Sequence, residues 1–196
     1  FWCHNPETLS PRAELQIYPE RCIGCGECFR RCPRGCHETV NGQRIFHRER
    51  CVACGTCVDT CYAQALVRVG ERKSVDEILA EILRDRPFYE TSGGGVTLSG
   101  GEPLLQAGFS QSILQRAREE GLHTAIETAA NYPWRRLASL LPFTDLVMVD
   151  LKCMDPARHR RATGVPNERI LANIRRLGTQ PQPLIVRTPI IPGVND

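Results

Sequence analysis

The fold of one part of this chain is decided by the stretch Cys22-Ile23-Gly24-Cys25-Gly26-Glu27-Cys28-Phe29-Arg30-Arg31-Cys32-Pro33. The same cysteine spacing is repeated at Cys51, Cys54, Cys57 and Cys61. A cube of four irons and four sulfides needs four thiolates. A Cys-x2-Cys-x2-Cys loop supplies three of them, and the fourth cysteine of the run reaches the neighbouring cube. The spacing therefore predicts two [4Fe–4S] clusters, one bound by Cys22, Cys25, Cys28 and Cys61 and the other by Cys51, Cys54, Cys57 and Cys32.

A short hairpin is expected between the two cysteine runs. Residues 38–45 read as two brief strands, and Asn41-Gly42 favours a two-residue hairpin turn. This arrangement resembles the internal pseudo-symmetry of bacterial ferredoxins, with Tyr62 in place of their usual proline. A pair of zinc sites is the alternative. Zinc rarely uses a third cysteine at the same interval, so the pattern favours clusters.

Composition limits the classes of protein that this chain can be. With 196 residues, 41% hydrophobic side chains and a net charge of +3, it fits a soluble globular protein that binds neither nucleic acid nor membrane. No apolar run approaches the ~20 residues of a membrane span, and no signal peptide is visible. Eleven cysteines without a secretory signal indicate metal ligation in a reducing cytoplasm. Cys36 and Cys153 lie outside the patterns, and we expect small buried side chains there.

The sequence divides into three stretches: a lead over 1–18, the cysteine-rich segment over 19–68, and an α/β segment over 69–196. In the last, Ser74 and Glu77 form a capping box, and strand and helix signals then alternate. This alternation predicts a parallel sheet with crossover helices. Strands are expected at 95–98, 124–127, 146–151 and 184–188, and helices at 109–120, from Pro133 onward, and at 167–177.

Polar residues follow the predicted strands where parallel α/β proteins keep their sites. These residues are Ser99–Pro103, Glu127 and Thr128, then Met148, Asp150 and Lys152 on one side of a strand, and finally Arg187. Together they suggest a small zwitterionic ligand. Taken alone, the glycine-rich loop could be a plain turn, Asp150 with Lys152 could be a simple ion pair, and His159 is expected on the surface.

These residues also resemble a known family. Phe1-Trp2-Cys3-His4-Asn5-Pro6-Glu7 looks like the end of a radical S-adenosylmethionine (SAM) signature, and Gly94–Pro103 looks like the family's glycine motif. Asp150-Leu151-Lys152, Asn167, Asn173 and Arg187 follow the same spacing. The chain thus resembles the radical SAM enzymes that activate glycyl-radical enzymes. The resemblance implies strands 2–5 of a partial (β/α)6 barrel with an inserted α+β ferredoxin-like domain, cut at both ends.

The resemblance implies an oxidoreductase. A reduced [4Fe–4S] cluster cleaves SAM to methionine and a 5′-deoxyadenosyl radical, which removes hydrogen from a backbone glycine of a partner glycyl-radical enzyme of the lyase or dehydratase type. Flavodoxin or ferredoxin would supply electrons, and the full-length protein would hold three clusters. The two clusters of the insert would relay electrons, with a structural or docking role as the alternative. With one of three radical-cluster cysteines present, we expect this chain not to cleave SAM alone.

The resemblance also implies site residues. Cys3 would be the last ligand of the radical cluster and, with Lys152, a catalytic residue, while Trp2 and His4 would lie beside the cofactor. Contacts to SAM would come from Gly100, Gly101, Glu102, Asp150, Leu151, Lys152 and Arg187. A monovalent cation would be bound by Glu127, Thr128, Met148 and Asp150, although the family more often has aspartate at Glu127 and glycine at Ala130.

Two other functions compete with this one. An iron–sulfur electron-transfer protein would need only the cysteine-rich segment, and the Ser99–Pro103 loop and Asp150–Lys152 speak against it. A radical SAM enzyme acting on another substrate would need all the same motifs. The segment after Cys3 and the position of the insert favour the activating enzymes.

Overall fold

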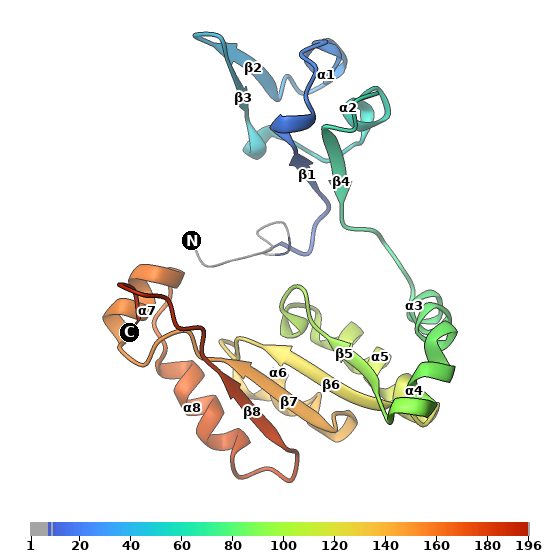
Figure 1. Cartoon of the computed structure of the whole chain (residues 1–196), viewed down its shortest axis with the longest axis vertical. Coiled ribbons are helices and arrows are strands. Elements are labelled where there is room, and N and C mark those ends of the chain that lie inside the picture. Colours follow the sequence, from blue (N-terminus) through green and yellow to red (C-terminus); the bar gives the residue numbers. More distant parts are fainter. Residues whose placement is uncertain (1–7, 9, 196) are drawn as a thin grey trace. The chain divides into compact units, whose positions relative to one another are not determined.

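The computed structural model describes residues 8 and 10–195. The chain forms two compact units, one within Glu7–Arg72 and one within Lys73–Asp196 (Figure 1). Among the described residues, no helix has both the length and the apolar composition needed to cross a membrane.

The cysteine-rich unit consists of two antiparallel strand pairs, each joined to a short helix. Strand β1 pairs with β4, and β2 pairs with β3. Asn41 and Gly42 both have positive φ, as the predicted hairpin turn requires. The elements are β1 (Glu14–Ile17), α1 (Glu27–Arg31), β2 (His37–Val40), β3 (Gln43–Phe46), α2 (Thr56–Asp59) and β4 (Leu66–Val69), with 3₁₀ turns at Pro19–Arg21 and Arg48–Arg50.

The two halves of this unit repeat one another. Segments 22–36 and 51–65 share the cysteine spacing, and a glycine in the left-handed conformation, Gly26 or Gly55, precedes each helix. The third cysteine of each run, Cys28 or Cys57, lies buried in the first turn of that helix. Leu15 and Leu66 pack with these two cysteines, so a small core separates the two cysteine loops.

The α/β unit contains one parallel sheet in the order β5-β6-β7-β8. The four strands lie where the sequence predicts them, and the Ser74–Glu77 capping box is confirmed. The strands are β5 (Gly95–Leu98), β6 (His123–Thr128), β7 (Leu146–Asp150) and β8 (Leu184–Arg187). The helices are α3 (Val75–Ile82), α4 (Arg86–Ser92), α5 (Ala107–Glu119), α6 (Trp134–Ala138), α7 (Pro156–Thr163) and α8 (Glu168–Leu177), with 3₁₀ turns at Leu83–Asp85, Pro103–Gln106 and Leu141–Phe143.

One face of this sheet is covered by helices. Val147 and Val149 are buried in a core with side chains of α5, α6 and α8, such as Leu114, Leu137 and Ile170. Because side chains alternate along a strand, Met148 and Asp150 project from the other face. At the end of the sheet order, Ile185 and Val186 of β8 keep 45% and 43% of their surfaces exposed.

His159 is not on the surface, and that expectation is wrong. It lies in α7, keeps 1% of its surface exposed, and its Nδ1 is 2.7 Å from the carbonyl oxygen of Val165. Although the segment is polar, α7 buries one face, which carries His159 and Ala162. The expectation of small buried side chains at Cys36 and Cys153 is confirmed, with exposures of 2% and 6%.

Candidate functional site

The first cysteine set lines one cavity of the cysteine-rich unit. Its volume is about 290 Å³, and its walls include the four cysteines of the first predicted set and Arg44 of β3. Burial raises the pKa of the Cys28 thiol above its ordinary value. The structure therefore brings together the cysteines that the sequence assigns to one cluster: Cys22, Cys25, Cys28 and Cys61.

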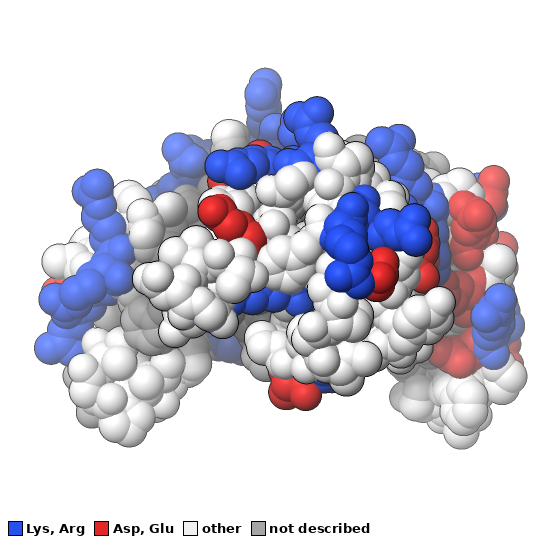
Figure 2. Space-filling model, turned by 90° about the horizontal axis from the view of Figure 1, so that it is seen from above, with Lys and Arg blue, Asp and Glu red and all other residues white. Residues whose placement is uncertain are grey.

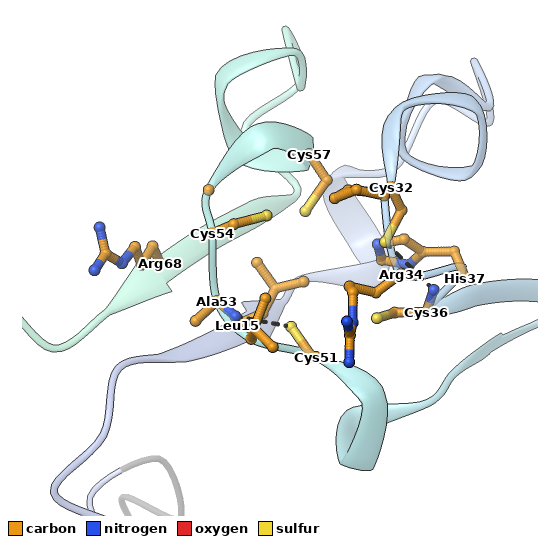
Figure 3. A pocket seen from close by; sticks show the side chains of 13 residues that line it. Leu15, Cys32, Arg34, Cys36, His37, Cys51, Ala53, Cys54, Cys57 and Arg68 are labelled. Atoms are coloured by element: carbon orange, nitrogen blue, oxygen red, sulfur yellow. Dashed lines mark hydrogen bonds between the residues drawn. The ribbon is translucent and has the colours of Figure 1, made fainter.

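The second cysteine set lines another cavity, narrower at about 20 Å³ (Figure 3). Backbone N–H groups donate to two of its sulfurs, from Cys36 to Cys32 Sγ at 3.3 Å and from Ala53 to Cys51 Sγ at 3.4 Å. Such donors stabilise thiolates and tune the potential of a cluster. The four assigned cysteines, Cys32, Cys51, Cys54 and Cys57, all line this cavity.

Cys36 is a fifth cysteine on the second wall, and Figure 3 shows it beside Cys32 and Cys51. Burial and the neighbouring cysteines Cys32 and Cys51 raise the pKa of its thiol to about 12. Its counterpart in the other half is Ala65, which is equally buried. Cys36 therefore occupies a position that a small apolar side chain also fills.

The first cavity has room for more than a single metal ion. In the part of the chain that the structure describes, no three His, Cys, Asp or Glu side chains close around one ion. A tetrahedral zinc site would need its sulfurs ~2.3 Å from the metal. Moreover, Arg44 Nε and His37 Nε2 are buried and lack a hydrogen-bond partner among the described residues, although both residues line the cavities. Such donors suit the sulfides of a cluster.

A chain of charged groups crosses the carboxyl edge of the parallel sheet. Asp150, at the end of β7, accepts hydrogen bonds from Lys152 Nζ at 2.8 Å and from Arg187 Nε at 3.0 Å. Arg187 also pairs with Glu127, which raises the pKa of the guanidinium. Burial alone would raise the pKa of Asp150, but the hydrogen bonds from Lys152 and Arg187 outweigh it and lower that pKa. These four ion-paired groups are thus two carboxylates and two cations.

The loop after β5 is anchored by the Glu102 side chain. One carboxylate oxygen accepts from Thr128 Oγ1 at 2.7 Å and from the Leu104 N–H at 3.1 Å, and the other accepts from the Ala129 N–H at 2.9 Å. Burial raises the pKa of Glu102, although these bonds oppose the shift. The carboxylate therefore links β5 to β6 and holds the glycine-rich loop at the same edge as Asp150.

Three buried or half-buried asparagines brace the loops of this edge, and the sequence did not reveal their roles. Asn167 donates to the carbonyls of Cys153 and Met154, and Asn173 to those of Ala130 and Tyr132. Asn195 donates to the carbonyl of Lys152. The only signal available was the family-like spacing of these residues, which gives no contact. Asn167 and Asn195 thus hold the loop after β7, and Asn173 holds the loop after β6.

The structure places some of the other residues predicted to contact SAM or to bind a cation. Trp2, Cys3 and His4 lie outside the described residues. Gly100 has a φ of +88° in the loop after β5, where Gly101 follows it. The side chain of Leu151 is buried in the core, so a ligand at the edge would meet its backbone.

Three of the four residues predicted to bind a cation make other contacts in this structure. Glu127 and Asp150 both pair with Arg187. The Thr128 hydroxyl donates to Glu102, and Met148 projects from the same face of the sheet as Asp150.

Charged side chains of both signs are mixed on the visible surface. Figure 2 shows Lys and Arg spread over this view, with smaller areas of Asp and Glu between them. Several exposed pairs are salt-bridged, including Arg86 with Glu120 and Arg116 with Asp76. Exposed pairs of this kind contribute little to stability. The charge pattern therefore does not single out a binding surface.

Two family models match this chain. The radical SAM superfamily matches residues 48–196, and the 4Fe-4S dicluster domain matches residues 14–62. The whole chain aligns with the (2S)-3-sulfopropanediol dehydratase activating enzyme of Klebsiella oxytoca at 40% identity, the isethionate sulfite-lyase activating enzyme of Nitratidesulfovibrio vulgaris at 41%, and the benzylsuccinate synthase activating enzyme of Thauera aromatica at 42%. It spans 63%, 66% and 61% of their lengths.

A solved structure is similar over part of the chain. It is a domain of the pyruvate-formate lyase-activating enzyme from Bacteroides vulgatus, 42% identical, with a TM-score of 0.50. The similarity covers 53% of this chain and 64% of that one.

Proposed function

The chain belongs to the radical SAM superfamily, and from this membership we propose that the whole protein is an activating enzyme that installs a radical on a glycine of a partner enzyme. The observation that carries the proposal is the end-to-end match of this chain to three activating enzymes. The partner would be a glycyl-radical enzyme of the lyase or dehydratase type. A glycine suits this reaction because its backbone is permissive enough to enter another protein's site.

SAM would bind at the carboxyl edge of the sheet. Lys152 and Arg187 suit the carboxylate of its methionyl group, while the Gly100–Glu102 loop suits the amino group. When bound, the radical cluster supplies one electron and SAM supplies the 5′-deoxyadenosyl group that takes a hydrogen atom from the glycine. The residues of this chain orient SAM: Lys152 and Asp150 hold each other at the edge, and Glu102 fixes the loop. Cys3 would be a ligand of the radical cluster, with Trp2 and His4 beside it.

The insert would hold two further [4Fe–4S] clusters, making three in the whole protein. The donor sets support this assignment, since each cavity is lined by three cysteines of one run and the fourth cysteine of the other, with Cys36 as an additional cysteine in the second cavity. We propose that they relay electrons from flavodoxin or ferredoxin to the radical cluster. A cytoplasmic location suits cysteines that must stay reduced. We further propose that strands β5–β8 are part of a radical SAM barrel.

A direct assay separates the three candidate functions. The whole protein is reconstituted without oxygen and mixed with SAM, a reductant and a glycyl-radical enzyme. Formation of 5′-deoxyadenosine together with a glycyl radical, detected by electron paramagnetic resonance (EPR), supports the proposal. 5′-Deoxyadenosine without that radical supports another substrate. Neither product, with all clusters intact, supports electron transfer alone.

Lys152→Ala is the informative variant in this assay. It removes a cation from the edge and leaves Asp150 paired with Arg187. We expect about a tenfold loss of 5′-deoxyadenosine formation, the effect of roughly one charge-assisted hydrogen bond. Lys73→Ala is the control, because Lys73 pairs with Glu81 on the surface, away from the sheet edge. Equal losses in both variants would remove Lys152 from the site.

A further inference from the structure

The two cysteine cavities are built alike, so a difference between them stands out. Strand β3 pairs with β2 in one half as β1 pairs with β4 in the other. Arg44 of β3 lies opposite Thr39, and Leu15 of β1 lies opposite Arg68 in the equivalent register. Arg44 lines the first cavity and Leu15 lines the second. One cavity therefore has a guanidinium where the other has an apolar side chain.

Arg44 is held against a cluster ligand. Its Nη1 donates to Cys22 Sγ at 3.7 Å, and its Nη2 lies 3.1 Å from His37 Nδ1. The guanidinium also lies over the ring of Phe29, 5.5 Å from its centroid. Since arginine can only donate, His37 Nδ1 must accept, which fixes the tautomer of this histidine. His37 is itself buried between Phe29 and Phe46, with ring centroids 5.7 and 5.2 Å away. Contacts with Cys22, His37 and Phe29 thus fix the position of the Arg44 guanidinium.

We propose that Arg44 raises the reduction potential of the cluster bound by Cys22, Cys25, Cys28 and Cys61. The inference rests on the proposed cluster-binding role of these cysteines. Reduction adds one electron to the cluster, so a nearby fixed positive charge and a hydrogen bond to a ligand sulfur stabilise the reduced form more than the oxidised form. Partial burial weakens the screening of this charge by salt. Arg44 is therefore a tuning residue and His37 positions it.

Other charged residues on the two walls do not provide the same effect. Glu27, on the first wall, is ion-paired with Arg30 and Arg31. Arg34 and Arg68, on the second wall, are exposed, and neither donates a hydrogen bond to a cysteine sulfur within the described chain. Figure 3 shows the side chain of Arg68 directed away from the sulfurs. The described contacts thus give only the first cluster a guanidinium bonded to a ligand.

Arg44→Leu tests this inference, because it gives the first cavity the side chain of its counterpart. The full chain is reconstituted without oxygen, its iron is counted, and both clusters are titrated electrochemically with EPR detection. At a fixed potential we expect the ratio of reduced to oxidised first cluster to fall about tenfold, which is about 59 mV for one electron. The midpoint of the second cluster should stay unchanged. Arg44→Lys, which keeps the charge without the planar fork, should shift the first midpoint less.

Arg48→Leu is the matched control. Arg48 follows the same hairpin and lies over Phe46 at 5.7 Å, but it pairs with Glu14 rather than with a cysteine. Neither midpoint should move in this variant. Unmoved midpoints in Arg44→Leu with full iron, or equal shifts of both clusters, would overturn the inference. If the leucine variant loses iron, Arg44→Gln is titrated instead under the same criteria. An iron-free wild-type chain would refute the cluster assignment itself, so the two failures are distinguishable.

Discussion

The side-chain amide of Asn173, on α8, donates a 2.8 Å hydrogen bond to the backbone carbonyl of Ala130, in the loop after β6. Ala130 is fully buried and has a φ of +53°. This left-handed conformation costs a non-glycine residue roughly 1–2 kcal/mol. A second bond, of 2.9 Å, reaches the carbonyl of Tyr132. One buried amide thus stabilises a loop conformation that the backbone itself disfavours.

Asn173→Ala should therefore destabilise the α/β unit. It leaves two carbonyls without their donor, and we expect the free energy of unfolding to fall by about 2 kcal/mol. Urea denaturation followed by circular dichroism measures this change. Gln180→Ala is the control, because the Gln180 amide makes long bonds near the surface, to Arg176 and Thr179. A loss no larger than that of the control would show that the amide does not brace the loop.

The cysteine assignment predicts the iron content of the reconstituted chain. Two cubes in the insert would give about eight irons, and Cys25→Ser should remove about half of them. Iron and acid-labile sulfide analyses provide the measurement. Cys153→Ser is the control, since Cys153 is buried in the other unit and should leave the iron unchanged. Tightly bound zinc in place of iron would contradict the assignment.

Acid should weaken the α/β unit through Asp145. Burial alone would raise the pKa of this carboxyl, but bonds from the Thr124 N–H and hydroxyl and the charge of Arg118 outweigh it and lower the pKa. A lowered folded-state pKa contributes stability above the unfolded value of about 3.9, and this contribution is lost as pH falls through the folded value. Asp145 is about one-third exposed, so we expect only about 1 kcal/mol.

Urea midpoints of the wild type and Asp145→Asn, measured from pH 7 down to pH 3, check this linkage. The difference between the two proteins should shrink below about pH 4. Asp85→Asn, at an exposed position, serves as the control and should follow the wild type throughout. A difference that is constant with pH would mean that Asp145 acts without its charge.

Arg187 lies where a monovalent cation bound by Glu127 and Asp150 would lie, so replacing it tests the predicted cation site. Its guanidinium contacts both Glu127 and Asp150, so the protein supplies a positive charge between them. Arg187→Met removes that charge, and we expect a loss of about 1 kcal/mol at low salt, because the groups are partly exposed. Potassium chloride should restore more stability than choline chloride if a small cation then enters. Equal responses to the two salts would exclude a cation bound by Glu127, Thr128, Met148 and Asp150.

Local signals in the sequence predicted much of this fold. Ser74 with Glu77, Asn41 with Gly42, and the apolar runs of the four parallel strands depend on neighbouring residues, and each is found where expected. The two cysteine sets line two separate cavities, because the spacing of the cysteines restricts which sulfurs can meet, and their assignment to clusters stays a prediction. Parallel strands share an edge, so the polar residues after β5–β8 were expected to gather there.

Contacts between distant segments could not be predicted in this way. The pairing of β1 with β4 joins Leu15 to the strand after the second cysteine run, although residues 1–18 had no strand signal. Arg44 reaches Cys22 only because β3 folds back across the cavity. Asp155 and Pro156 cap the start of α7, but they lie in a polar stretch that shows no apolar periodicity. The sequence therefore indicated an exposed position for His159, which is buried. Helix α4 likewise has no buried residue to give it a periodic pattern.

The exposed strand β8 has a consequence for handling this chain in solution. Among the described residues it pairs on one side only, with β7, and it presents Ile185 and Val186 to solvent. An open edge with apolar side chains is a template on which another chain can add a strand, and natural sheets guard against this with lysine or proline. Positions 184–187 contain neither lysine nor proline. Concentrated samples should therefore self-associate through this strand. Val186→Lys should then lower the light scattering of such samples, and unchanged scattering would place the association elsewhere.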